Sequence, residues 1–158
     1  MDFGTIRDLE GNLIASGKAA LDTLIPMRAI SNDLFAIERA QFVSQGRRGG
    51  GSWAKLKPDT IARKGHAQIL RDTRALVDSV TRRDAPFQIL EVRNTELIFG
   101  TDRPWAGVHQ HGSAYKNRPA RPFIKILPTD VSRWTSMIAR HLTRPFQNEN
   151  LRHYFTNV

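Results

Sequence analysis

The apolar residues near the start of the chain recur at a helical spacing. Leucine and isoleucine residues from Leu13 to Ile37 fall on one face of a helix, and this pattern stops at Gly46. Pro26 lies within the stripe. Because proline is tolerated in a first helical turn but costs about 3 kcal/mol in a helix interior, the pattern predicts either a kinked helix or two helices that meet at Pro26. The polar residues 1–12 are expected to form a loosely held leader.

A short basic segment follows this helical region. Residues 45–52 contain three consecutive glycines together with Arg47 and Arg48. Consecutive glycines are too permissive for a helix or strand interior, so the segment is predicted to be a flexible loop. A phosphate-binding loop would end in Gly-Lys-Ser or Gly-Lys-Thr, and this segment has no such ending.

Two short helical patterns come next. Pro58 stands at a favourable first helical position, and that pattern ends near Gly65. Asp72 is a suitable N-cap for a second helix that extends to Val80. We therefore expect two helices between the basic loop and the middle of the chain.

Alternating and β-branched patterns then predict strands. Residues 87–92 and 95–99 are separated by two residues, one of them asparagine, which favours a tight hairpin. Residues 101–121 form a long connection punctuated by glycine and proline, a kind of segment that is usually functional or ordered by a partner. Residues 121–127 are expected to form another strand, at a sheet edge because they contain a proline.

The end of the chain predicts one more helix and an arm. The helix begins after Pro128-Thr129-Asp130, carries a long apolar stripe and ends at Pro145. The C-terminal arm, residues 145–158, contains Tyr154 and Phe155. These side chains are too apolar for an idle solvated end, so the arm is expected to dock, on this chain or on another subunit.

The order helix, helix, hairpin, strand, helix predicts the fold class. It indicates a small α+β domain spanning residues 1–158 as a single unit, with long loops and arms. An antiparallel or mixed sheet is expected to be packed by the N-terminal and C-terminal helices. A chain of 158 residues is long enough to bury a core of its own.

Composition narrows the possible classes. With 40% apolar and 25% charged residues, the chain is expected to be globular, and it has no apolar run long enough to cross a membrane and no signal-like start. The absence of cysteine excludes disulfides, thiol catalysis and cysteine-ligated metals. The net charge of +9 favours a polyanionic neighbour, which is either nucleic acid or an acidic protein surface.

Residues with catalytic chemistry are sparse. His109 and His111 form the one histidine cluster, but a metal would need a third ligand, and ordinary hydrogen-bonding roles near Gly112 are the favoured interpretation. The acidic residues are scattered singly, and Ser79 does not lie in a nucleophile motif. The sequence therefore predicts no cofactor and no enzyme, and a small hydrolase would require a site that the sequence does not display.

Local basic patches leave nucleic-acid binding open. These patches are Arg47-Arg48, Arg82-Arg83 and residues 118–121. Aromatic side chains that could stack on bases are Trp53, Trp105, Tyr115 and Phe123. No known nucleic-acid-binding motif is present, and arginine is also the preferred cation of protein interfaces. An Arg-rich assembly interface, or a surface beside packaged DNA, is the favoured interpretation.

Four segments carry a more specific pattern. They read GSWAKLKPDTIARKG at 51–65, ILRDTRALVDSV at 69–80, FGT followed by WAGVHQHG within 99–112, and PARPFI at 119–124. In this order they resemble the tailed-phage virion morphogenesis family, also called tail-completion proteins. With the preceding helix, the likeness spans residues 27–142. One departure is Thr73-Arg74, where the family pattern leads us to expect Thr-Gly.

The resemblance implies a structural rather than catalytic protein. Such proteins form homo-oligomeric rings at the head–tail junction or the top of the tail, and a hexamer is the expected order. Expected partners are other neck, connector and tail-tube proteins, with non-specific contact to packaged DNA and no membrane. The protein is then expected in the virion, after assembly in the host cytoplasm. The alternative function is a basic nucleic-acid-binding accessory protein.

Candidate assembly residues follow from their chemistry and position. Trp53 is expected chiefly as a packing anchor for the helix that follows it, Phe123 as a core residue, and Arg121 in a buried or interface ion pair. The full set of candidate interface residues is Arg47, Arg48, Trp53, Trp105, Arg121, Phe123, Tyr154 and Phe155.

Overall fold

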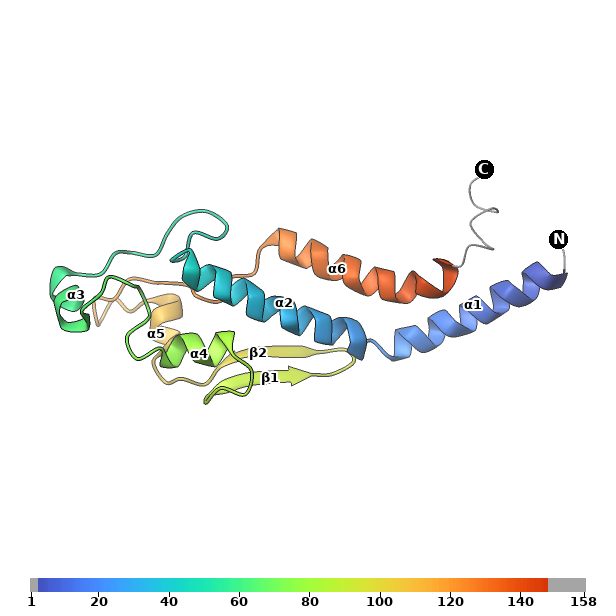
Figure 1. Cartoon of the computed structure of the whole chain (residues 1–158), viewed down its shortest axis with the longest axis horizontal. Helices are drawn as coiled ribbons and strands as arrows, with labels where there is room; N and C mark the ends of the chain where they lie inside the picture. Colours follow the sequence, from blue (N-terminus) through green and yellow to red (C-terminus); the bar gives the residue numbers. More distant parts are fainter. Residues whose placement is uncertain (1–2, 148–158) are drawn as a thin grey trace. The chain divides into compact units, whose positions relative to one another are not determined.

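The structure is a computed structural model that describes residues 3–147 (Figure 1). Its elements are α1 (Phe3–Leu21), α2 (Leu24–Val43), α3 (Pro58–Lys64), α4 (Ala75–Thr81), β1 (Gln88–Val92), β2 (Leu97–Thr101), α5 (Ala106–His111), α6 (Pro128–Thr143) and the 3-10 helix η1 (Arg144–Gln147). The two strands form an antiparallel sheet, so the predicted α+β class is confirmed.

The elements divide into two compact units. The helical unit comprises Met1–Ile30, Val92–Glu96 and Pro128–Val158, and the core unit comprises Ser31–Glu91 and Leu97–Leu127. The helical unit therefore holds α1, the first turns of α2, the hairpin turn and α6. The core unit holds the rest of α2, both strands and the short helices α3, α4 and α5.

The helical unit begins with two helices that meet just before Pro26. Helix α1 ends at Leu21, and the amide of Leu24 donates to the Asp22 side chain at 3.3 Å. Pro26 lies in the first turn of α2, where its missing N–H leaves no helical bond unmade. The two-helix alternative is therefore confirmed, and a kinked continuous helix is excluded.

The prediction of a loose leader over residues 1–12 is wrong for the described residues. Helix α1 starts at Phe3, and the segment contains no proline. Ile6 lies seven residues before Leu13 and therefore on the same helix face, so the apolar stripe extends further upstream than the sequence analysis placed it. The prediction failed because apolar residues are few among residues 1–12, although they keep a helical spacing.

Helix α6 packs against α1 within the helical unit. The Ser16 hydroxyl donates to the backbone oxygen of Leu142 at 3.2 Å, and the His141 ring lies 2.7 Å from the backbone oxygen of Asp22. The side-chain amide of Asn94, in the hairpin turn, donates to the backbone oxygen of Leu21 at 3.1 Å. The predicted C-terminal helix is thus confirmed from Pro128 to Thr143.

Aromatic side chains form the centre of the core unit. Phe42, on α2, packs edge-on against Trp53 with ring centroids 5.3 Å apart, and against Phe123 at 6.2 Å. The Trp53 indole N–H donates to the backbone oxygen of Pro122 at 3.0 Å, which satisfies its polar end. The buried cluster consists of Phe42, Trp53, Ile69, Leu76, Val77, Val80, Ala106 and Phe123.

Helix α4 lies beside both α2 and β2 in the core unit (Figure 1). The Thr101 hydroxyl of β2 donates to the Ser79 hydroxyl of α4 at 2.8 Å. Arg39 of α2 donates to the backbone oxygen of Thr81 at 3.0 Å. These bonds hold both neighbours against the short helix.

The predicted bounds are correct for α3 and differ from the structure for α4. Helix α3 starts at Pro58 as predicted and ends at Gly65, whose φ of 73° is the left-handed conformation of a C-cap. Helix α4 begins three residues later than predicted, and Asp72 does not cap it. Arg74 precedes α4 with a φ of 62°, a conformation that favours glycine. This is the position where the family pattern leads us to expect glycine.

In the second half of the core unit, the predicted strand over residues 121–127 is wrong, and the helix α5 was not predicted. Residues 121–127 form no strand, and β1 and β2 are the strands of the described part of the chain. The side chain of Gln110 instead binds the segment, accepting from the amides of Phe123 at 3.0 Å and Ile124 at 3.2 Å. Its own amide donates to the backbone oxygen of Ile124 at 2.9 Å. Gln110 belongs to α5, which lies within the connection predicted to be irregular.

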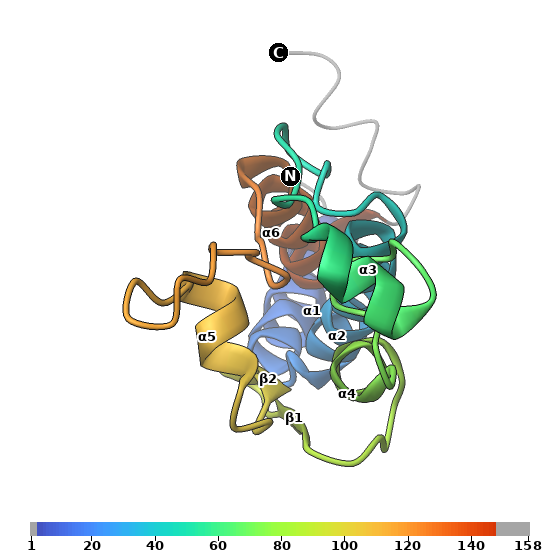
Figure 2. The same ribbon diagram turned by 90° about the vertical axis from the view of Figure 1, so that its left-hand side faces the viewer.

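The short helices α3, α4 and α5 lie at one end of the core unit (Figure 2). An irregular segment joins α3 to α4, and the hairpin stands between α4 and α5 in the chain. Four residues separate β1 from β2 rather than the predicted two, and the amide of Arg93 donates to the backbone oxygen of Glu96 at 2.8 Å across this turn. Among residues 3–147, no helix has the length and hydropathy needed to span a membrane.

Candidate functional site

The basic loop is a loop in the structure, and side chains bind it to the segment before α6. Arg48 donates to the backbone oxygen of Lys125 at 2.8 Å, and the Lys125 ammonium donates to the backbone oxygen of Gly49 at 3.3 Å. Arg47 is exposed. Gly46 has a φ of 82° and lies against the Trp53 ring, so a side chain there would collide with it. The loop therefore presents Arg47 from a backbone that is fixed at both ends.

Trp53 and Phe123 are core residues. They retain 4% and 2% of their side-chain exposure, respectively, which agrees with the expected packing roles. Because both rings are buried, neither can contact another subunit directly. They could contribute to an assembly surface only by holding the neighbouring backbone in place. Tyr154 and Phe155 lie outside the described residues.

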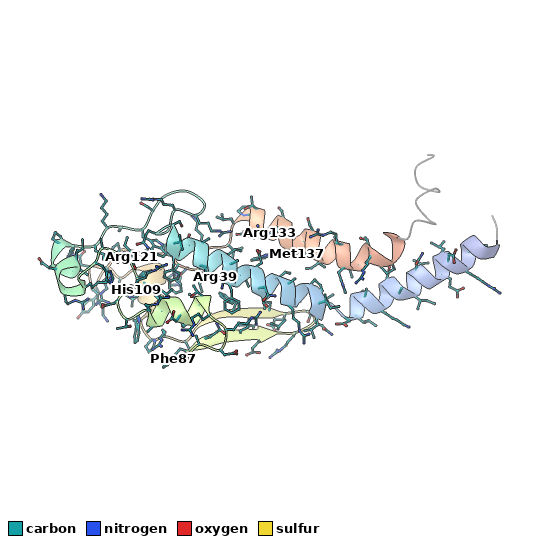
Figure 3. All side chains as sticks on the ribbon, viewed as in Figure 1. Arg39, Phe87, His109, Arg121, Arg133 and Met137 are labelled. Carbon is teal, nitrogen blue, oxygen red and sulfur yellow. The ribbon has the colours of Figure 1, made fainter. Side chains whose placement is uncertain are left out.

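Arg121 does not form the predicted ion pair within the chain. Its guanidinium donates to the backbone oxygens of Ala54 at 3.0 Å and Lys55 at 3.3 Å, and no carboxylate among residues 3–147 binds it. Its backbone amide donates to the backbone oxygen of His109 at 2.7 Å, and Figure 3 shows the two side chains close together. Because its acceptors are backbone carbonyls, the positive charge of Arg121 stays uncompensated.

Arg121 and His109 line a cleft of about 630 Å³ in the core unit, which we call the cationic cleft. Each of the four segments that carry the family pattern contributes to its wall. The first segment contributes Leu56, Lys57, Thr60, Arg63 and Lys64, and the second contributes Leu70 and residues 72–76. Trp105 and His109 come from the third segment, and Pro119 and Arg121 from the fourth. Residues 116–118 complete the wall.

The charge of the cationic cleft is strongly one-sided. Seven lysine and arginine side chains line it against a single acidic residue, Asp72. Asp72 forms an exposed ion pair with Arg63 at 3.1 Å, and Arg74 lies 3.5 Å from Asp78. The Lys64 ammonium donates to the backbone oxygen of Gln68 at 2.6 Å, which leaves its charge in place.

The ionisable groups of the cationic cleft respond to this charge. Burial lowers the pKa of His109, and the neighbouring cations Arg118 and Arg121 lower it further. Burial also lowers the pKa of Lys64, partly opposed by Asp72, while Arg63 and Arg121 act in the same direction as burial. A site in which cations depress each other's protonation favours the entry of an anion.

Trp105 adds an aromatic surface to the cationic cleft. Its side chain is 42% exposed, and the Arg103 guanidinium lies 5.5 Å from its ring centroid. Of the candidate interface residues, the structure thus brings Trp105 and Arg121 together in one site. Arg47 and Arg48 lie on the basic loop, which does not line the cleft.

Arg82-Arg83, the second predicted basic patch, makes contacts within the chain. Arg82 lies 3.7 Å from Asp78, and Arg83 donates to the Asn32 side chain at 2.5 Å and to the Ser31 hydroxyl at 3.2 Å. Both arginines of this predicted patch therefore interact with side chains of the same chain.

One further ionisable group is buried in the core unit. Glu38, on α2, has no exposed surface, and neither carboxylate oxygen has a hydrogen-bond partner among the described residues. Burial raises the pKa of Glu38 to about 8, and the positive charge of Arg48 opposes this shift. Within residues 3–147, no three histidine, aspartate or glutamate side chains gather as a metal site would require.

Sequence reasoning missed most of the cationic cleft. Its lysines and arginines stand singly or in pairs on four separate segments, so no local charge run marks them. The available signal was the set of four ordered segments, which converge on one cavity in the folded chain.

Comparison with known proteins places these four segments in a family. The sequence profile of the phage virion morphogenesis family matches residues 2–143, so the chain belongs to this family. The chain is also similar to Mu-like prophage FluMu G protein 2 of Haemophilus influenzae. The two are 34% identical over 109 residues, which cover 66% of this chain and 67% of the relative. No solved structure matches the chain.

Proposed function

We propose that this protein is a structural component of a phage virion that acts at the head–tail junction or the top of the tail, as a homo-oligomeric ring. The family match over residues 2–143 carries the proposal, because it supports a role in virion morphogenesis and suggests a structural rather than catalytic protein. The position in the particle, the ring and its expected sixfold order are the proposed refinements.

The exposed face of α1 supports self-assembly. Ile6, Leu9, Leu13 and Ile14 are each between 44% and 58% exposed on this helix. Contiguous apolar surface of this kind is typical of protein interaction sites. A ring is a closed assembly in which one surface of each copy meets a different surface of the next. The apolar face of α1 supplies one such surface.

Two measurements test the proposal. Native mass spectrometry of the purified chain should show one closed oligomer, with a hexamer expected. Labelling of the protein in intact particles should place it between the head and the tail. A chain that is monomeric at all concentrations and absent from mature particles would contradict the proposal.

A second candidate function is a basic nucleic-acid-binding accessory protein, which the net charge of +9 favours. Titration with duplex DNA at rising salt separates the two functions. Sequence-dependent binding that survives physiological salt would favour the accessory protein. Weak binding that disappears with salt is expected from a virion protein that lies beside packaged DNA.

A further inference from the structure

The cationic cleft concentrates charge that the fold does not neutralise. It holds seven basic residues and one acidic residue, in a chain whose net charge is +9. Arg121 and Lys64 donate to backbone carbonyls, which accept a hydrogen bond without cancelling the charge. Lys116 and Arg118 are exposed and form no ion pair within residues 3–147. Like charges held this close together raise the free energy of the empty site, which a bound anion would lower.

The wall of the same cleft is partly apolar. Leu56 and Leu70 are half-buried, Leu76 is buried, and Trp105 presents an exposed ring. A ligand that matches both parts of the wall must carry anionic groups beside apolar ones. Aspartate and glutamate side chains placed between leucine-like side chains meet both requirements.

The size of the cavity favours a peptide over a nucleic-acid backbone. A volume of about 630 Å³ is in the range that holds a few side chains or a small ligand. A phosphodiester backbone supplies the negative charge but no aliphatic groups to cover Leu56 and Leu70. Arginine forks, four of which line the cleft, bind carboxylates in pairs.

Within this chain the nearest match is Asp8-Leu9-Glu10, a single alternation that directly follows Arg7 on α1. The chain has no two adjacent acidic residues, and its 15 aspartates and glutamates are scattered among 24 lysines and arginines. A second copy of the chain, also at +9, would therefore bring little negative charge to the cleft. The complementary segment belongs to a different protein.

We propose that the cationic cleft binds an acidic segment of a partner protein, in which aspartate or glutamate side chains alternate with apolar side chains. The carboxylates bind the lysines and arginines of the rim, and the apolar side chains cover Leu56, Leu70 and Trp105. That the partner is a neighbouring virion protein rests on the proposed function, whereas the binding itself does not.

The test uses defined probes and the full chain. A fluorescein-labelled peptide of four Glu-Glu-Leu repeats is titrated by fluorescence anisotropy, beside its Gln-Gln-Leu counterpart and a labelled 20-base-pair duplex. We expect the acidic peptide to bind and the neutral peptide to bind at least about tenfold more weakly. The double variant Lys116→Glu/Arg118→Glu should weaken binding of the acidic peptide by about tenfold or more.

The matched control makes the same charge change away from the cleft. Arg7→Glu/Lys18→Glu alters two exposed cations of α1 and should leave peptide affinity within about twofold, because exposed charges interact weakly through salt solution. Equal losses in the two double variants would overturn the proposal, because binding would then follow net charge alone. Equal binding of both peptides, or tighter binding of the duplex with displacement of the acidic peptide, would also overturn it.

The mass of the oligomer, measured on the same variants, separates this inference from the proposed function. If wild-type chains form no ring, the proposed function fails while the peptide titration still reports on the cleft. If wild-type chains form a ring and Lys116→Glu/Arg118→Glu keeps it, the cleft serves another protein, as proposed. Loss of the ring in this variant with the ring retained in Arg7→Glu/Lys18→Glu would assign the cleft to a second copy and overturn the choice of partner.

Discussion

Helix α1 and the cationic cleft present opposite chemistries to a partner. The exposed face of α1 is apolar and comes from one continuous segment, with Ile6 and Leu13 seven residues apart. The cationic cleft is built from four segments, and its charge comes from side chains distant in sequence. An amphipathic helix needs only spacing to form an apolar face, whereas a cleft needs a folded core behind it. Two surfaces of different chemistry allow one chain to bind two different neighbours.

The largest expected effect is on the core that supports the cleft. Trp53→Ala removes a buried ring and its bond to the Pro122 oxygen, and should lower the free energy of unfolding by about 3–5 kcal/mol. Leu13→Ala, on the exposed face of α1, should change it by less than about 0.5 kcal/mol. Urea denaturation measures both. Similar shifts for the two variants would show that Trp53 does not support the core.

Buried Glu38 should make stability depend on pH. Because its folded-state pKa is raised from 4.5 to about 8, the folded protein keeps a proton that the unfolded chain releases between these values. Stability should therefore fall as pH rises from about 4.5 to about 8, and level off above that. Glu38→Gln removes the ionisable group and should stabilise the protein by about 4 kcal/mol at pH 8, and by little at pH 4.

Urea denaturation across this pH range checks the effect of Glu38→Gln. The control is Glu10→Gln, which makes the same change at an exposed position of α1 and should alter stability little at either pH. A Glu38→Gln variant whose advantage did not grow with pH would contradict the assignment of a buried, neutral carboxyl group.

The backbone before α4 gives a smaller effect. Arg74 has a φ of 62°, which costs a residue with a side chain about 1 kcal/mol relative to glycine. Arg74→Gly should therefore be more stable than Arg74→Ala by about 1 kcal/mol, since both variants lose the exposed pair with Asp78. Thermal unfolding of the two variants measures the difference. If alanine were as stable as glycine, the left-handed conformation would be wrong.

The smallest effect on stability is expected on the exposed face of α1. Leu13→Gln keeps a good helix former and should change the unfolding free energy by less than about 0.5 kcal/mol, while reducing the oligomer measured by sedimentation. Lys18→Gln, also exposed on α1, should leave the oligomer intact. An unchanged oligomer in Leu13→Gln would remove this face from the assembly surface.

Sequence patterns predicted the elements whose ends are set by their own residues. Pro58 and Gly65 fixed both ends of α3, because proline suits a first helical turn and glycine suits a left-handed C-cap. Pro26 likewise lay at the junction of two helices. The family resemblance, carried by four ordered segments, also came from sequence alone, and the profile match confirmed it.

Only the tertiary structure decided the features that depend on distant side chains. Residues 121–127 have a strand-like composition, but Gln110 binds the amides of Phe123 and Ile124, so the segment needs no neighbouring strand. The cationic cleft likewise forms from lysines and arginines whose sequence positions show no charge run. Backbone propensity depends on a few neighbouring residues. Hydrogen bonding and electrostatic interactions between distant residues depend on distances that exist only in the folded chain.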